Sequence, residues 1–191
     1  MPERMRCRAP VVAWAALAAS GAAPEWAAAY VRGPVMFLQA PGTGQSQVAA
    51  HVLAHEMSHL VLNRFFPRPP PLWLNEGLAE WYGSIAWKAF QGRRALPHAE
   101  LTGLRDPLPL ALVLAAEGYP ADPQTIGRFY RTSHHLVGFL MLQRDQQAFV
   151  RFLERITVNG LPQMQALREV YGFESVAELE AAFHQFLREK N

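Results

Sequence analysis

The segment from His55 to His59 reads H-E-x-x-H and carries the clearest chemistry in the chain. An α-helix repeats every 3.6 residues, so His55 and His59 stand one turn apart on the same helix face. Two imidazole nitrogens placed in this way can bind one Zn²⁺ at roughly 2.0–2.1 Å. Glu56 leaves the helix beside that face, so its carboxylate is placed to reach a water molecule at the metal rather than the metal itself. The motif predicts a single zinc ion in a hydrolytic site.

The residues after this motif separate the classes of zinc peptidase. A metzincin continues H-E-x-x-H-x-x-G-x-x-H, but Leu62 and Phe65 occupy the positions of the glycine and the third histidine. That class is therefore excluded. Prolines gather between Pro67 and Pro71, and because proline cannot continue a helix, we expect the first helix to end near Phe66 and the chain to turn.

A second helical segment is expected from Asn75 to Trp87, with Glu76 in its first turn and Glu80 one turn later on the same face. Glu76 can complete a set of two histidines and one glutamate, which leaves a fourth position for water as catalytic zinc requires. Glu80 can accept the other ring N–H of a metal-binding histidine, or it can be an ordinary solvated carboxylate. The apolar stripe of this helix consists of Leu78, Trp81, Tyr82 and Ile85.

Two stretches of sequence resemble the gluzincins, and in particular the small peptidase MA-like domains. They are VLAHEMSHLVL and PPLWLNEGLAEWY, the second being similar to a W-L-x-E-G-x-A-E-[WY] block. A weaker likeness extends over most of residues 24–190. The resemblance implies that His55, His59 and Glu76 bind Zn²⁺ and that Glu56 is the general base. It also implies a zinc metallopeptidase that acts on a peptide or protein substrate.

The fold class expected is α+β and mostly helical. The resemblance implies a zincin-like fold with a small N-terminal edge sheet, the H-E-x-x-H helix, a second zinc-ligand helix and a C-terminal helical bundle. The short apolar segment Pro34–Gln39 ends at a turn signal and is expected to be a strand. By the resemblance it is an edge strand that holds an extended peptide, and the alternative is a plain core strand.

A donor to the oxyanion of the reaction is usual in such sites, and the candidates lie in the second half of the chain. Tyr130 and His134 are preferred, with His135 as a further candidate, although residues of these types also serve simply to pack helices together. Two other functions remain open: a zinc-stabilised binding or scaffold domain without catalysis, and a hydrolase of a non-peptide amide. An intact Glu56 argues against the scaffold, because metal retention needs no base there.

The remaining histidines are weaker candidates. His51 lies four residues before His55, but it is eight residues from His59, roughly 12 Å along a helix, so it cannot share a metal with both. We expect it to neighbour the site. His98 and His184 are expected to be ordinary surface or half-buried residues.

Composition narrows the range of functions. Half of the 191 residues are hydrophobic and 18% are charged, which is typical of a globular domain. With a net charge of +2 and no long run of like charge, nothing indicates nucleic-acid binding. Cys7 is the only cysteine, so a disulfide within the chain and a zinc site built from several cysteines are excluded. The sequence does not indicate an oligomeric state.

Residues 1–23 are either a signal peptide or a ragged N-terminal segment, and residues 24–191 form one domain. Arg4, Arg6 and Arg8 precede an apolar stretch from Val11 to Ala19, as in a secretory signal. If the segment is a signal, the protein is secreted or periplasmic, and otherwise it is cytoplasmic. No apolar run reaches the roughly 20 residues of a membrane span.

Further helices are expected along the rest of the chain. The zinc helix should begin near Ser46. Two short helices are expected within the Gly- and Pro-rich stretch 91–124, and Asp122-Pro123 should begin a long helix. Ser175-Val176-Ala177-Glu178 is a capping box. The ranges of these later helices are 99–104, 108–117, 122–144, 146–158, 162–171 and 175–189.

Overall fold

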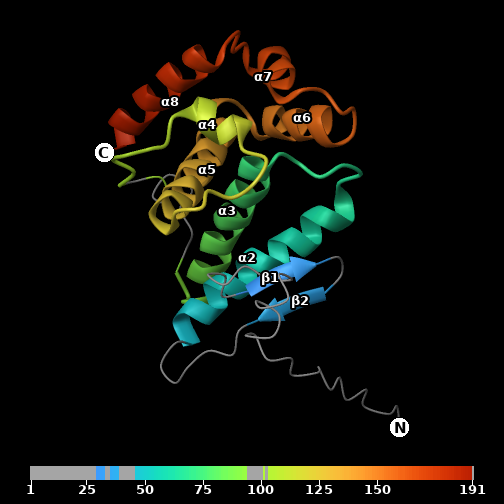
Figure 1. Ribbon diagram of the computed structural model, residues 1–191, viewed down its shortest axis with the longest axis vertical. Coiled ribbons are helices and arrows are strands. Elements are labelled where there is room, and N and C mark those ends of the chain that lie inside the picture. The colour runs from blue at the N-terminus through green and yellow to red at the C-terminus, as the bar shows by residue number, and fades with distance from the viewer. Residues whose placement is uncertain (1–28, 33–34, 39–45, 94–100, 102, 191) are drawn as a thin grey trace.

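The computed structural model describes residues 29–32, 35–38, 46–93, 101 and 103–190. These residues form seven helices and one hairpin (Figure 1). The hairpin lies against α2 at one end of the molecule, α3 and α5 run through the middle, and α6, α7 and α8 cover the opposite end. The mostly helical character expected from the sequence is confirmed, and the β structure described amounts to one short hairpin. The expected N-terminal segment 1–23 and His98 lie outside the described residues.

The hairpin consists of β1 (Ala29–Arg32) and β2 (Val35–Leu38), which pair antiparallel with Ala29 opposite Leu38. Both strands contact α2. The strand expected over Pro34–Gln39 corresponds to β2. The partner strand β1 was not predicted, because four residues between alanines and a glycine are too few to show an alternating pattern.

Helices α2 (Ser46–Phe65) and α3 (Leu72–Phe90) form a helical hairpin. The prediction for α2 was right to within one residue, since the prolines that follow end the helix. Helix α3 begins three residues before the expected start, directly after Pro71, so the prediction that Glu76 lies in the first turn was wrong. The extra turn at the start of α3 buries Trp73 and Leu74 completely. This burial stabilises the first turn, which has no capping side chain.

Helix α5 (Pro123–Gln143) packs along α3, and its start is fixed as the sequence predicts. The Asp122 carboxylate accepts a hydrogen bond from the backbone N–H of Thr125 at 2.7 Å, and proline occupies the first helical position. The two helix backbones approach closely at Gly77. A Cβ placed there would lie 2.5 Å from the carbonyl oxygen of Ser133 and 2.6 Å from Val137 Cγ2.

Gly77→Ala is expected to destabilise the fold. The added methyl group meets backbone on α5, which cannot move aside as a flexible side chain could, so α3 and α5 must separate. Overpacking of this kind costs about 1–3 kcal/mol. Chemical denaturation of the metal-free variant should show this loss. Gly127→Ala is the control on α5, because a Cβ there meets nothing within 4 Å. Equal stability of the two variants would contradict the close approach.

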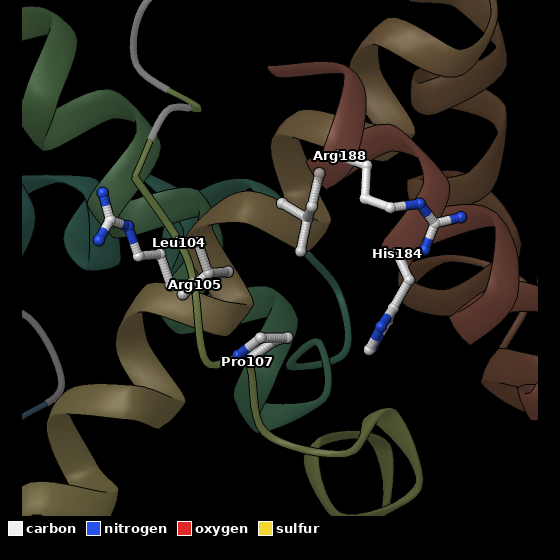
Figure 2. A pocket seen from close by; sticks show the side chains of 6 residues that line it. Leu104, Arg105, Pro107, His184 and Arg188 are labelled. Carbon is white, nitrogen blue, oxygen red and sulfur yellow. The ribbon is translucent and has the colours of Figure 1, made fainter. Parts of the chain in front are cut away.

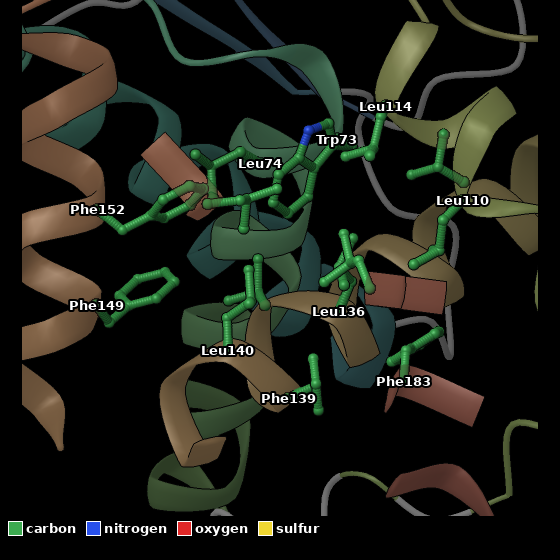
Figure 3. Packing of buried hydrophobic residues seen from close by; sticks show 14 of the residues in the cluster. Trp73, Leu74, Leu110, Leu114, Leu136, Phe139, Leu140, Phe149, Phe152 and Phe183 are labelled. Atoms are coloured by element: carbon green, nitrogen blue, oxygen red, sulfur yellow. The ribbon is translucent and has the colours of Figure 1, made fainter. Parts of the chain in front are cut away.

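The other helices complete the core. They are α4 (Leu110–Ala115), α6 (Gln146–Thr157), α7 (Gln163–Tyr171) and α8 (Val176–Lys190). Each corresponds to an expected helix. Of the further helix expected at 99–104, residues 101, 103 and 104 are described: Leu101 has a 3₁₀-helical conformation, and Gly103 and Leu104 are not helical. Figure 3 shows aromatic and aliphatic side chains of α3 and α5 packed together with side chains of α4, α6 and α8. Trp73, Leu136, Phe139, Leu140, Phe152 and Phe183 are essentially inaccessible to solvent.

The capping box at the start of α8 differs in one detail from the expected form. Ser175 Oγ accepts a hydrogen bond from the N–H of Glu178 at 3.2 Å, as predicted. The Glu178 carboxylate, however, accepts the N–H of Glu174 at 2.9 Å, one residue further out than the usual partner. Among the helices described, none is both long enough and apolar enough to cross a membrane.

Candidate metal centre

Three buried side chains from two helices converge at the α2–α3 interface. His55 and His59 on α2 are each 8% exposed, and Glu76 on α3 is 1% exposed. Their nearest atoms are His55 Nε2, His59 Nε2 and Glu76 Oε2. The two nitrogens are 3.1 Å apart, and Oε2 lies 3.3 Å from His55 Nε2 and 3.5 Å from His59 Nε2. The structure therefore brings together the three residues predicted as metal ligands.

These separations fit a tetrahedral metal ion. Two atoms that each lie about 2.05 Å from a tetrahedral ion are about 3.3 Å from each other. The three observed distances, from 3.1 to 3.5 Å, fall around this value. Glu76 Oε2 is fully buried and has no hydrogen-bond partner among the described residues. Two imidazoles and one carboxylate are also a donor set that zinc accepts. The group could hold a metal ion.

Helix α2 can present both histidines to α3 because the helices approach closely. A Cβ added at Gly83 of α3 would lie 3.4 Å from the backbone nitrogen of His55. That is an ordinary van der Waals distance, so the backbones of α2 and α3 lie within about one side-chain atom of each other here. The close approach lets a glutamate side chain reach imidazoles on the neighbouring helix.

Glu80, one turn after Glu76, contacts the far side of the His55 ring. Its Oε1 lies 3.0 Å from His55 Nδ1, and its Oε2 lies 3.6 Å from His51 Nε2. A proton on His55 Nδ1 faces this carboxylate, which leaves Nε2 directed at Glu76 and His59. His51 thus neighbours the site without joining the three converging residues, as the helix spacing predicted.

The two carboxylates hold a positive charge on His55. Burial alone would lower the pKa of His55, but the carboxylates of Glu76 and Glu80 outweigh burial and raise it from 6.5 to about 10. Burial would likewise raise the pKa of Glu76, but His55 and His59 lower it well below its ordinary value. Without a metal, a proton on His55 Nε2 lies where the ion would bind. A metal must therefore displace this proton.

In the metal-free protein, His55 is expected to stay cationic at pH 8, where an ordinary histidine is neutral. Because protons compete with zinc for Nε2, the affinity for zinc should rise with pH and should level off once the pH approaches the pKa of His55. Nitrogen-15 NMR of the imidazole, recorded over pH in chelator-treated protein, measures the charge directly. A neutral His55 ring at pH 8 would contradict the two-carboxylate contact.

Glu80→Gln is expected to weaken zinc binding by about tenfold, the lower end of the effect of removing such a partner. The amide keeps the size of the side chain but loses the charge that favours a proton on His55 Nδ1. Competition with a chromophoric chelator gives the dissociation constant. Glu117→Gln, which removes an exposed carboxylate, is the matched control and should leave it unchanged. Equal affinity of the two variants would show that Glu80 is only a solvated carboxylate.

Glu56 lies beside the converging group on α2 and is 7% exposed. Burial raises the pKa of its carboxyl group, while the charges of His55 and His59 oppose the shift. Its oxygens are not among the ligand atoms that gather within 4.8 Å of one another. Glu56 is thus a buried carboxylate next to the site but outside the ligand set.

Tyr119 was missed by sequence reasoning. It lies between α4 and α5, and its hydroxyl donates a 2.7 Å hydrogen bond to Glu76 Oε1, the carboxylate oxygen that does not face the histidines. A tyrosine in a Gly-Tyr-Pro loop, 43 residues after its partner, shows neither a helical period nor a motif. No local signal in the sequence could have identified it.

The predicted oxyanion donors occupy different places. The Tyr130 ring meets His55 edge-on, with 5.9 Å between ring centroids, and stacks on Tyr119. His134 lies against Trp81 of α3, with 5.7 Å between centroids, and burial lowers its pKa to about 4. The Nδ1–H of His135 donates a 2.8 Å hydrogen bond to the backbone carbonyl oxygen of Arg131, one turn earlier on the same helix. Tyr130 is therefore in ring contact with a member of the converging group.

Two surface cavities are lined by residues outside the converging group. One, of about 290 Å³, lies between the loop before α4 and helix α8. Figure 2 shows that its arginines, Arg105 and Arg188, extend away from each other, and exposed His184 stands at its edge. The other, of about 260 Å³, is apolar and includes Met57, Val61 and Tyr82.

Comparison of the chain with protein-family models, with curated proteins and with solved structures gives no significant match.

Proposed function

We propose that this protein is a zinc-dependent hydrolase of the gluzincin type that cleaves peptide bonds. One observation carries the proposal: His55, His59 and Glu76 place three buried ligand atoms at the mutual distances of a tetrahedral zinc site. Three protein ligands leave a fourth position for water, which distinguishes catalytic from structural zinc. The two sequence blocks that resemble gluzincins are the ones that supply these ligands.

In this proposal Glu56 moves the proton. Bound zinc would polarise water and lower its pKa towards about 7. Glu56, buried beside the site, takes a proton from that water and later returns it to the leaving amine. Its raised pKa suits it to both tasks. Tyr130 is preferred over His134 as donor to the oxyanion, because Tyr130 contacts His55 whereas His134 packs against Trp81.

The substrate segment is proposed to lie extended along the hairpin. Among the described residues, β1 and β2 pair only with each other, so each has one edge without a described partner. An extended peptide can pair with such an edge through main-chain hydrogen bonds. The hairpin contacts α2, the helix that carries Glu56. We propose that a peptide paired with the hairpin runs along α2 to the candidate metal centre. Pairing of this kind reads the peptide backbone and favours a peptide over another amide.

A scaffold domain that holds zinc without catalysis is the main competitor. Such a domain would gain nothing from a buried glutamate beside the ligands, and burying an ionisable group without a task is costly. The test is cleavage of a peptide library by zinc-loaded protein, by chelated protein and by protein reloaded with zinc. We expect cleavage in the first and third samples only. Zinc-loaded protein that cleaves no peptide would favour the scaffold, and cleavage of small amides alone would favour the non-peptide hydrolase.

A further inference from the structure

The inner end of Tyr119 reaches the candidate metal centre from a loop. Although 41% of the residue is exposed, its hydroxyl donates a 2.7 Å hydrogen bond to Oε1 of Glu76, which is 1% exposed. The two carboxylate oxygens of Glu76 thus have different contacts. Oε2 faces His55 and His59 at 3.3 and 3.5 Å, and Oε1 is bound by the tyrosine.

We propose that Tyr119 is a positioning residue that makes Glu76 a one-oxygen ligand. This inference rests on the proposed function, because it concerns how the same three residues hold their metal. A carboxylate can bind a metal through one oxygen or through both. An oxygen that already accepts a short hydrogen bond from a hydroxyl is a poorer ligand and is held away from the ion, so only Oε2 remains available.

The ring of Tyr119 is held so that the hydroxyl stays in place. It stacks on Tyr130 with 6.1 Å between centroids and 22° between planes. Tyr130 in turn contacts His55 and Phe129, which is 1% exposed. The loop is anchored at its far end, where Asp122 caps α5. Tyr119 is therefore fixed by the same helix that packs on α3.

Coordination by one oxygen has a direct consequence for chemistry. Two nitrogens and one oxygen fill three positions of a tetrahedral site, and the fourth is left for water. If Glu76 bound through both oxygens, the carboxylate would take that fourth position or force a fifth ligand. Tyr119 thereby keeps the position for water open, without touching the substrate itself.

Tyr119→Phe tests the inference, because it keeps the stacked ring and removes only the hydroxyl. We expect the zinc dissociation constant to rise about 10- to 100-fold, as for other residues that orient metal ligands. In the cobalt-substituted protein, the visible absorption should lose intensity as a second carboxylate oxygen joins the ion. A residue with a purely structural role would leave that spectrum unchanged. Tyr82→Phe, which removes a hydroxyl from a 48% exposed tyrosine of α3, is the control and should change neither property.

The wild-type protein provides an independent measurement should the variant fail to fold. Zinc-edge X-ray absorption is expected to show four nearby ligand atoms, with one carboxylate oxygen among them. Two carboxylate oxygens at bonding distance would overturn the inference. If wild type binds zinc but Tyr119→Phe keeps the wild-type affinity and cobalt spectrum, the inference fails and the proposed function stands. A wild-type protein that binds neither ion overturns both.

Discussion

Glu56→Gln is expected to abolish measurable peptide hydrolysis while zinc binding stays at the wild-type level. Glutamine has nearly the same size but cannot take a proton from water at neutral pH. General acid–base catalysis by a positioned side chain contributes about 10²- to 10⁴-fold to a rate, so a loss of at least this size is expected. The measurements are the cleavage rate of a peptide library and the zinc content of the same sample.

The control for this substitution is Glu117→Gln, which makes the same change of charge at an exposed position between α4 and α5. It should cleave at the wild-type rate. The proposed role of Glu56 is contradicted if Glu56→Gln retains its zinc and cleaves as fast as this control. If neither the wild type nor Glu56→Gln cleaves peptides while both bind zinc, the result supports the scaffold domain instead.

Glu76→Ala is expected to weaken zinc binding more than any change at Glu80 or Tyr119. It removes a ligand atom itself, whereas the other two residues act through a ligand. Loss of an orienting partner costs at most about 100-fold in affinity, so the loss at Glu76 should exceed 100-fold. Chelator competition in the same buffer for all variants gives the ranking.

The same substitution should also change the charge state of His55 in the metal-free protein. Without Glu76, one of the two carboxylates that raise the pKa of His55 is absent, and burial pulls the pKa down. The pH at which the ring loses its proton should therefore fall. Wild-type zinc affinity in Glu76→Ala would remove Glu76 from the site, and an unchanged His55 titration would show that its carboxylate does not contact the ring.

The convergence of His55, His59 and Glu76 at one point could be predicted from the sequence. Coordination chemistry limits the residue types, and the helix period limits their spacing. The spacing of the histidines requires one helix face, and the prolines from Pro67 onward require a turn back. A second helix on that return path then has to bring Glu76 alongside. Local chemistry was equally informative at Asp122, where a capping residue followed by proline marked the start of α5.

Features that depend on tertiary contacts could not be predicted in this way. Tyr119 reaches Glu76 because α4 and α5 position the loop between them. The residues next to Tyr119 in the sequence form no pattern that predicts this contact. The first turn of α3 forms because Trp73 and Leu74 are buried by other helices, which outweighs the missing cap. Tyr82, expected in the apolar stripe of α3, is 48% exposed because α2 and α5 cover other sides of that helix.

The proposed zinc site is tested most directly by a crystal structure of the zinc-loaded protein with anomalous data collected at the zinc edge. We expect one strong anomalous peak per chain, at about 2.0–2.2 Å from His55 Nε2, His59 Nε2 and Glu76 Oε2. No peak between these atoms in zinc-loaded crystals, or a peak bound by a different set of residues, would contradict the proposed site.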